Sequence, residues 1–159
     1  MIPKSPTRIV LDTNVCLDLF VFRDPRWQRL MQALTDGEVE AVTRADCKME
    51  WHIVLGYAHL GLDEAMQNAV RAEFDALIRP CAETIPDGSI KLPICRDTDD
   101  QKFIELAHQS GATMLITKDK ALLKLARKTL KAGLFQIVTP ETWLAMESIS
   151  ASDETQHVF

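Results

Sequence analysis

Short apolar runs alternate with longer segments of helical periodicity along most of this chain, and this alternation is what most constrains its fold. Apolar runs of strand length lie at 8–11, 39–43, 113–117 and 135–139. The segments between them carry apolar residues at intervals of three and four, which is typical of amphipathic helices. Strands separated by helices of ten or more residues indicate βαβ units. The sequence therefore predicts a three-layer α/β/α sandwich around a central, mainly parallel sheet.

The helix predicted over 46–60 places Met49, Ile53, Tyr57 and Leu60 on one apolar stripe. This stripe is expected to hold the helix against the sheet. A turn is predicted at 86–89. The other predicted helices cover 15–22, 25–34, 63–79, 99–110 and 119–131, and a last one begins with Thr139 as its cap and Pro140 in its first turn.

The length of 159 residues fits one domain with a core of its own. A hydrophobic share of 47% and a charged share of 26% are values of a globular protein. We assign residues 1–147 to a single domain. Residues 148–159 are polar enough to form a loose C-terminal tail.

Several classes of protein are disfavoured by the composition. No apolar run approaches the roughly 20 residues that span a bilayer, so no membrane contact and a cytoplasmic location are expected. The four cysteines are scattered without a CxxC pair, which favours reduced thiols. A net charge of −5 argues against non-specific coating of nucleic acid, although a local basic patch remains compatible with it.

Acidic residues follow two of the apolar runs and occupy two of the predicted helices. Asp12 ends the first run, and Asp119 lies two residues beyond the third. The remaining candidates are Glu50 in helix 46–60 and the acids that open helix 99–110, which are Asp97, Asp99 and Asp100. Because the carboxyl ends of parallel strands share one edge of a sheet, where ligand sites form, we expect these acids to converge.

Convergence of carboxylates has an electrostatic consequence. Two carboxylates about 4 Å apart repel by roughly 1 kcal/mol in water and by about 4 kcal/mol at an effective dielectric constant near 20. A cluster of four therefore needs protons or a cation. Oxygen ligands favour hard ions, so the sequence predicts Mg²⁺ or Mn²⁺.

Each acid also has a purely structural interpretation. Asp12 and Asp119 are each placed to cap the helix that follows. Thr98 and Gln101 match a capping box, which would leave the neighbouring acids at the positive end of helix 99–110. Glu50 would then be a solvated helix residue.

Four separated motifs carry the acids in a recognisable order. They are IVLDTNV at 9–15, MEWHIVL at 49–55, CRDTDDQKFIELA at 95–107 and MLITKDKALL at 114–123. This series resembles the PIN-domain family of nucleases and covers most of the chain. The resemblance implies a PIN-like fold related to the Rossmann type, with Asp12, Glu50, Asp100 and Asp119 as the catalytic and metal-binding acids.

The resemblance also implies supporting residues. Asn14 and Thr117 would position a ligand or a water molecule, and Asp97 would support the metal site. Whether Asp97 or Asp99 reaches the metal beside Asp100 stays open at this point.

The activity implied by the resemblance is divalent-metal-dependent endonucleolytic hydrolysis of RNA phosphodiester bonds, by water activated on Mg²⁺ or Mn²⁺. Many members of the family are toxins of prokaryotic toxin–antitoxin pairs. An RNA substrate, a protein antitoxin and a second copy of the chain are the partners implied.

A basic stripe on the predicted helix 119–131 has two interpretations. Its residues are Lys120, Lys124, Arg127, Lys128 and Lys131, and the apolar side would be Leu122, Leu123, Ala126 and Leu130. The stripe is either a solvated outer face or a guide for RNA phosphates, with Lys120 and Lys124 as the RNA-binding candidates nearest to Asp119.

Three alternative functions remain. A haloacid dehalogenase-like phosphatase also carries an acid after its first strand, but its D-x-D motif is broken here by Asn14. A non-catalytic RNA- or protein-binding module would keep the fold without the chemistry. Helices 46–60 and 63–79 would form the docking surface if binding of an inhibitory protein were the main role.

Overall fold

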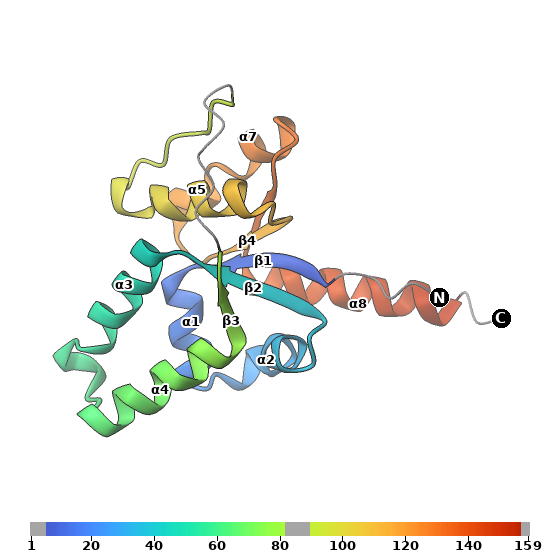
Figure 1. Ribbon diagram of the computed structural model, residues 1–159. Coiled ribbons are helices and arrows are strands. Elements are labelled where there is room, and N and C mark those ends of the chain that lie inside the picture. The colour runs from blue at the N-terminus through green and yellow to red at the C-terminus, as the bar shows by residue number, and fades with distance from the viewer. Residues whose placement is uncertain (1–5, 82–89, 157–159) are drawn as a thin grey trace.

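The four predicted strands and one further strand form a five-stranded sheet in which every neighbouring pair runs parallel (Figure 1). The computed structural model describes residues 6–81 and 90–156, and the turn predicted at 86–89 lies outside them. The strand order is β3-β2-β1-β4-β5. The strands are β1 Thr7–Leu11, β2 Val39–Thr43, β3 Ile78–Pro80, β4 Met114–Ile116 and β5 Gln136–Val138.

Helices connect consecutive strands and cover both faces of the sheet. The α-helices are α1 Thr13–Phe20, α2 Gln28–Thr35, α3 Ala45–Leu55, α4 Glu64–Leu77, α5 Gln101–Ser110, α6 Lys120–Leu123, α7 Ala126–Lys131 and α8 Pro140–Gln156. The 3₁₀ helices are η1 Pro25–Trp27, η2 Ala58–Leu60 and η3 Thr98–Asp100.

Two hydrophobic clusters lie on opposite faces of the sheet, because side chains alternate along each strand. On β1, Ile9 and Leu11 pack in the first cluster and Val10 in the second. Residues of α1, α2, α4 and α8 cover the first face, and residues of α5 and α6 cover the second (Figure 1). This arrangement confirms the predicted three-layer α/β/α sandwich.

Strand β3 is not among the predicted strands, since its residues fall at the end of the helix predicted over 63–79. The helix ends at Leu77, and Ile78 takes an extended conformation with φ −118° and ψ 120°. Ile78 is the partner of Ala41 on β2. Pro80 disfavours helical backbone at the residue before it, which helps to end the helix here.

Helix α3 buries a different face from the predicted one. Met49, Ile53 and Tyr57 are exposed, with exposed fractions of 64%, 56% and 47%. The buried residues are Cys47, Trp51 and Leu55. The ring of Trp51 stacks on Phe74 with centroids 5.2 Å apart and meets Phe20 edge-on at 6.1 Å. Burial of this indole, the largest side chain of the helix, sets its rotation.

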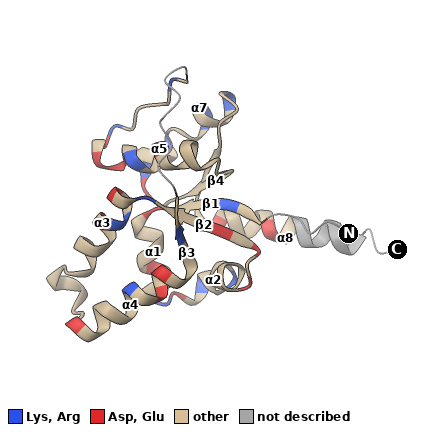
Figure 2. Cartoon of the chain, in the orientation of Figure 1, with Lys and Arg blue, Asp and Glu red and all other residues tan. Residues whose placement is uncertain are grey.

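The helix predicted over 119–131 is broken in two. The N–H of Leu125 donates to the carbonyl of Leu122, a three-residue step that is tighter than an α-helical turn. The step rotates the residues that follow, so Leu125 and Thr129 are buried while Leu130 is 63% exposed. The basic residues still lie on the exposed side, and Figure 2 shows Lys and Arg gathered on α7.

Helix α8 starts as predicted and runs further than predicted. The hydroxyl of Thr139 accepts a hydrogen bond from the N–H of Thr142 at 3.1 Å, which confirms the cap. The helix passes 147 without a break and ends at Gln156. Residues 148–156 are therefore helical and not a loose tail, because neither Gly nor Pro follows Pro140 to interrupt the helix.

Two further expectations concern the cysteines and membrane-spanning helices. Cys16, Cys47 and Cys95 are buried free thiols, as their scattered positions predict. Within residues 6–81 and 90–156, no helix combines the length and the apolar character needed to cross a lipid bilayer.

The rotation of α3 yields a prediction for stability. Trp51→Ala should lower the free energy of unfolding by about 3–5 kcal/mol, since it empties the space that the indole fills against two other rings. Met49→Ala, on the exposed side of the same helix, should change it by less than about 0.5 kcal/mol. Urea unfolding of the two variants measures both values, and equal losses would contradict this rotation of α3.

Candidate active site

The strand order creates a switch point between β1 and β4. The chain leaves β1 toward β2 and β3 and then returns to the other side of β1 with β4 and β5. Connections after β1 and β4 therefore diverge, and ligands of such sheets bind beside the carboxyl ends of these two strands. Asp12 follows β1 directly, and Asp119 follows β4 by three residues. The N–H of Asp12 donates to the carbonyl of Ile116 at 3.0 Å, which ties the two connections together.

Asp12 is both a helix cap and a buried acid. It is only 4% exposed, its Oδ1 accepts the N–H of Thr13 at 2.7 Å, and its Oδ2 accepts the hydroxyl of Thr117 at 2.6 Å. Burial raises the pKa of Asp12 to about 6, against the effect of these hydrogen bonds. The charges of Glu50 and Asp119 raise this pKa further, so both carboxylates lie near Asp12.

Thr117 links the first acid to the last. Its side chain is fully buried, and its hydroxyl accepts the N–H of Asp119 at 2.9 Å while it donates to Asp12. Asp119 in turn accepts the N–H of Ala121 at 2.7 Å and so caps α6. One threonine therefore contacts the carboxylate of Asp12 and the backbone of Asp119, which follow different strands.

The helical turn that carries the acids before α5 has a different cap residue from the predicted one. Asp97, and not Thr98, caps η3 by accepting the N–H of Asp99 at 3.0 Å. The side chain of Gln101 does not take part in a capping box. It accepts the N–H of Cys95 at 2.7 Å and donates to the carbonyl of Pro93 at 3.1 Å. Gln101 thereby holds the loop that carries these acids.

Three of the acids come close enough to share one ion. Asp97, Asp100 and Asp119 each offer a carboxylate oxygen, and these oxygens lie within 4.8 Å of one another. Burial raises the pKa of Asp100 to about 7, and a hydrogen bond with Asp119 and the charges of Asp12, Asp119 and Asp97 act in the same direction. In the part of the chain that the structure describes, Asp99 is not in this group.

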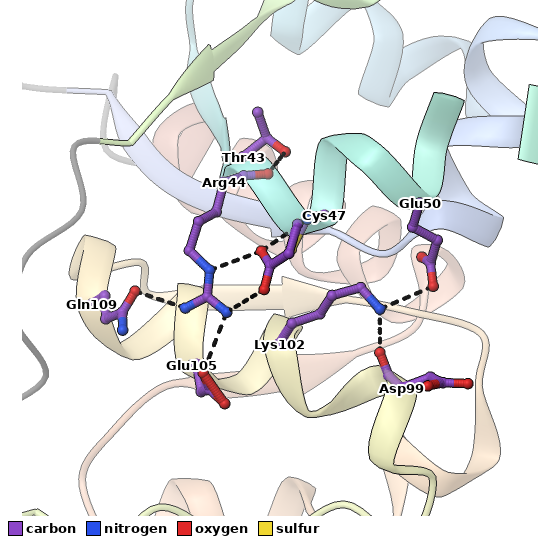
Figure 3. Close-up of polar contacts among 9 residues, drawn as sticks. Thr43, Arg44, Cys47, Glu50, Asp99, Lys102, Glu105 and Gln109 are labelled. Carbon is purple, nitrogen blue, oxygen red and sulfur yellow. Dashed lines mark hydrogen bonds and ion pairs between the residues drawn. The ribbon is translucent and has the colours of Figure 1, made fainter. Parts of the chain in front are cut away.

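Glu50 reaches the acids from α3 and is held by two donors. Its Oε2 accepts the hydroxyl of Thr13, and its Oε1 lies 3.0 Å from Nζ of Lys102 (Figure 3). Among residues 6–81 and 90–156, the group within 4.8 Å does not include Glu50. We call Asp12, Glu50, Asp97, Asp100 and Asp119 together the acidic cluster.

The contacts of Thr13 and Lys102 with Glu50 are absent from the expectations drawn from sequence. Lys102 stands in the third motif, where it is the only basic residue between Asp97 and Glu105. A single base within a run of acids was the available signal. Thr13 lies between two candidate residues and carries no such signal.

A second contact joins α3 to α5 near the cluster. The guanidinium of Arg44, at the start of α3, bonds to Asp46 of the same helix at 2.9 and 2.7 Å. It also reaches Gln109 at 2.8 Å and Glu105 at 3.3 Å on α5 (Figure 3). The side chain of Arg44 is only 12% exposed, whereas its acidic partners Asp46 and Glu105 remain 47% and 40% exposed.

The donor set of the site suits a hard cation. All side chains of the acidic cluster present carboxylate oxygens, the ligands that Mg²⁺ and Mn²⁺ prefer. Oδ1 of Asn14, in the first turn of α1, is buried and accepts no hydrogen bond from the residues that the structure describes. A buried oxygen without a donor is uncommon and fits a place where a cation or a water molecule binds.

The raised pKa values predict how stability depends on pH without metal. Asp12 and Asp100 hold protons more tightly in the folded chain, at pKa values of about 6 and about 7, than at their ordinary value of 3.8. The folded chain therefore binds more protons between about pH 4 and 7, and the free energy of unfolding falls as the pH rises through that window. Since one pKa unit corresponds to about 1.4 kcal/mol, Asp12 alone lowers it by on the order of 3 kcal/mol.

Urea unfolding at several pH values in the presence of a chelator measures this fall. Asp12→Asn should make it shallower, and Mg²⁺ in place of the chelator should counteract it, because a bound cation favours the ionised acids. A free energy of unfolding that stays constant from about pH 4 to 7 would mean that the acids do not interact as described.

Comparison with known proteins agrees with this geometry. A search of curated proteins finds no match to the chain. A family model described as PIN domain matches residues 8–121, more than half of the chain and a range that contains the whole acidic cluster. PIN domains are generally nucleases and typically depend on divalent metal ions. The chain therefore belongs to the PIN-domain family.

Proposed function

We propose that this protein is a divalent-metal-dependent endoribonuclease that hydrolyses phosphodiester bonds of RNA with Mg²⁺ or Mn²⁺. The observation that carries the proposal is the acidic cluster at the switch point of the sheet. Acids from four separate parts of the chain meet there, and the pKa values of two of them are raised by burial and mutual repulsion. A cation would relieve that repulsion, and family membership supports a nuclease.

Asp97, Asp100 and Asp119 are the residues that would hold the ion, with Asp12 beside them. The bound ion would activate water and stabilise negative charge on the phosphate oxygens. Thr117 orients the carboxylate of Asp12 and holds the backbone of Asp119, since its hydroxyl donates to the first and accepts the N–H of the second. The proposed nucleophile is water, so no side chain forms a covalent intermediate.

Removal of a carboxylate from the cluster tests this function. Asp12→Asn and Asp119→Asn should each lower the rate of RNA cleavage by about 100-fold or more, the scale of losing a group that stabilises charge in the transition state. The measurement is cleavage of a panel of RNAs with Mg²⁺, Mn²⁺ or chelator.

Asp36→Asn is the matched control. Asp36 is exposed on the turn before β2, at the opposite edge of the sheet, and its loss should leave cleavage unchanged. Full activity of Asp12→Asn, or activity in chelator that ignores the substitutions, would overturn the proposal. Either result would mean that the cleavage does not depend on the acidic cluster.

The proposal extends to a role as the toxin of a toxin–antitoxin pair, with a protein antitoxin and a second copy of the chain as partners. It is supported by the resemblance of the motifs to such toxins and by apolar side chains exposed on α3 and α4, which include Met49, Ile53 and Met66. Expression in cells tests this role. We expect the wild-type chain to arrest growth and Asp12→Asn not to do so.

Lys120 and Lys124 are the proposed RNA contacts. Both are exposed, and Lys120 directly follows Asp119. Lys120→Glu and Lys124→Glu should each raise KM for RNA and lower the slope of log affinity against log salt by about 0.7 for each phosphate that the variant no longer neutralises. Steady-state kinetics over a range of salt concentrations measures both effects.

The control for these variants is Lys48→Glu, the same charge change on α3, where Lys48 pairs with Asp75 at 3.0 Å. It should leave KM and its salt dependence unaltered. Equal kinetics in all of these variants would mean that Lys120 and Lys124 belong to an ordinary solvated surface.

A further inference from the structure

Lys102 places a positive charge inside the acidic cluster. It lies on α5, two residues after Asp100, and its side chain is only 17% exposed. Its ammonium group contacts Oε1 of Glu50 at 3.0 Å and donates to the backbone carbonyl of Asp99 (Figure 3). Contacts to α3 and to η3 thus fix the ammonium between two elements that build the cluster.

Both carboxylate oxygens of Glu50 already accept a hydrogen bond in this arrangement. One of its oxygens accepts from Lys102, and the other accepts from the hydroxyl of Thr13. A divalent ion binds carboxylate oxygens directly, at about 2.0–2.1 Å for Mg²⁺. Each oxygen of Glu50 keeps a second lone pair beside these bonds, so an ion bound there would lie next to the ammonium group of Lys102.

The cluster divides into two sides with Asp12 between them. Asp97, Asp100 and Asp119 form one side. Glu50 with Lys102 and Thr13 forms the other. Asp12 accepts the N–H of Thr13 on that side, and it accepts the hydroxyl of Thr117, which bonds to the N–H of Asp119, on the first side. Centres that hydrolyse phosphodiesters with two ions place them roughly 3.5–4 Å apart. A second ion here would need Asp12 and Glu50, on the side where an ammonium group already lies.

We propose that Lys102 takes the place of a second metal ion, so that this protein binds one divalent ion per chain. The inference rests on the proposed metal centre. Lys102 supplies positive charge beside Glu50 whatever the metal concentration, and it repels another cation from that side. It also orients Glu50 and is a positioning residue in this sense.

Stoichiometry of Mn²⁺ binding tests the inference without reference to activity. Isothermal titration calorimetry gives the number of bound ions, and electron paramagnetic resonance measures the Mn²⁺ that stays free. Both should give one ion per wild-type chain. Lys102→Met keeps most of the aliphatic side chain but removes the charge and the bond to Glu50, so the number of ions should double to two. Lys102→Gln should behave in the same way.

Two controls separate the position of the charge from its mere presence. Lys102→Arg keeps a cation beside Glu50 and should bind one ion. Lys48→Met removes one positive charge elsewhere on α3, where Lys48 pairs with Asp75, and should also bind one ion. Thermal unfolding in chelator verifies that each variant is folded before titration.

The outcomes distinguish this inference from the proposed function. Two ions bound by the wild-type chain, or a single ion bound by both folded variants Lys102→Met and Lys102→Gln, would overturn the role of Lys102 and leave a metal-dependent nuclease intact. No Mn²⁺ bound by the wild-type chain would overturn the metal centre itself, and the inference with it.

Discussion

Repulsion among carboxylates that the fold forces together is the constraint on which the rest of this structure depends. At an effective dielectric constant near 20, each close pair costs about 4 kcal/mol when both members are ionised. The chain opposes this with backbone N–H groups and the hydroxyl of Thr117, which bond to Asp12 and Asp119. These bonds offset the effects of burial and repulsion only in part, since the pKa values of Asp12 and Asp100 remain raised, with burial as the larger cause.

Capping and chemistry are not alternatives in this protein. Asp12, Asp97 and Asp119 each cap a helix and each belong to the acidic cluster. For Asp12 and Asp119 the reason lies in the architecture of a parallel sheet, because a helix that begins just after a strand has its cap residue at the carboxyl edge of the sheet. The partial positive charge of such helix starts favours carboxylates at that edge. Local stability and the electrostatics of the site therefore select the same residue type.

Much of the fold and several site residues could be predicted from sequence, because they depend on local pattern. Strand β2 matches its predicted run at 39–43, and Asp12 and Asp119 follow their strands as expected. The rotation of α3 could not be predicted, since it depends on the packing of Trp51 against Phe20 and Phe74, which are distant in sequence. The contact of Lys102 with Glu50 spans 52 positions and is likewise invisible to periodicity. Membership of Asp97 in the tight group depends on how the loop before η3 is held.

Helices α3 and α5 are joined at two levels, by Arg44 to Gln109 and Glu105, and by Glu50 to Lys102. A single contact between two helices sets their separation. The bonds of Arg44 to Gln109 and of Lys102 to Glu50 lie more than one turn apart along both helices, so together they also resist twisting of one helix against the other. The angle at which Glu50 enters the cluster is therefore determined before any ion arrives. Ion capture at this site would proceed on a preorganised frame, with little loss of conformational entropy in α3.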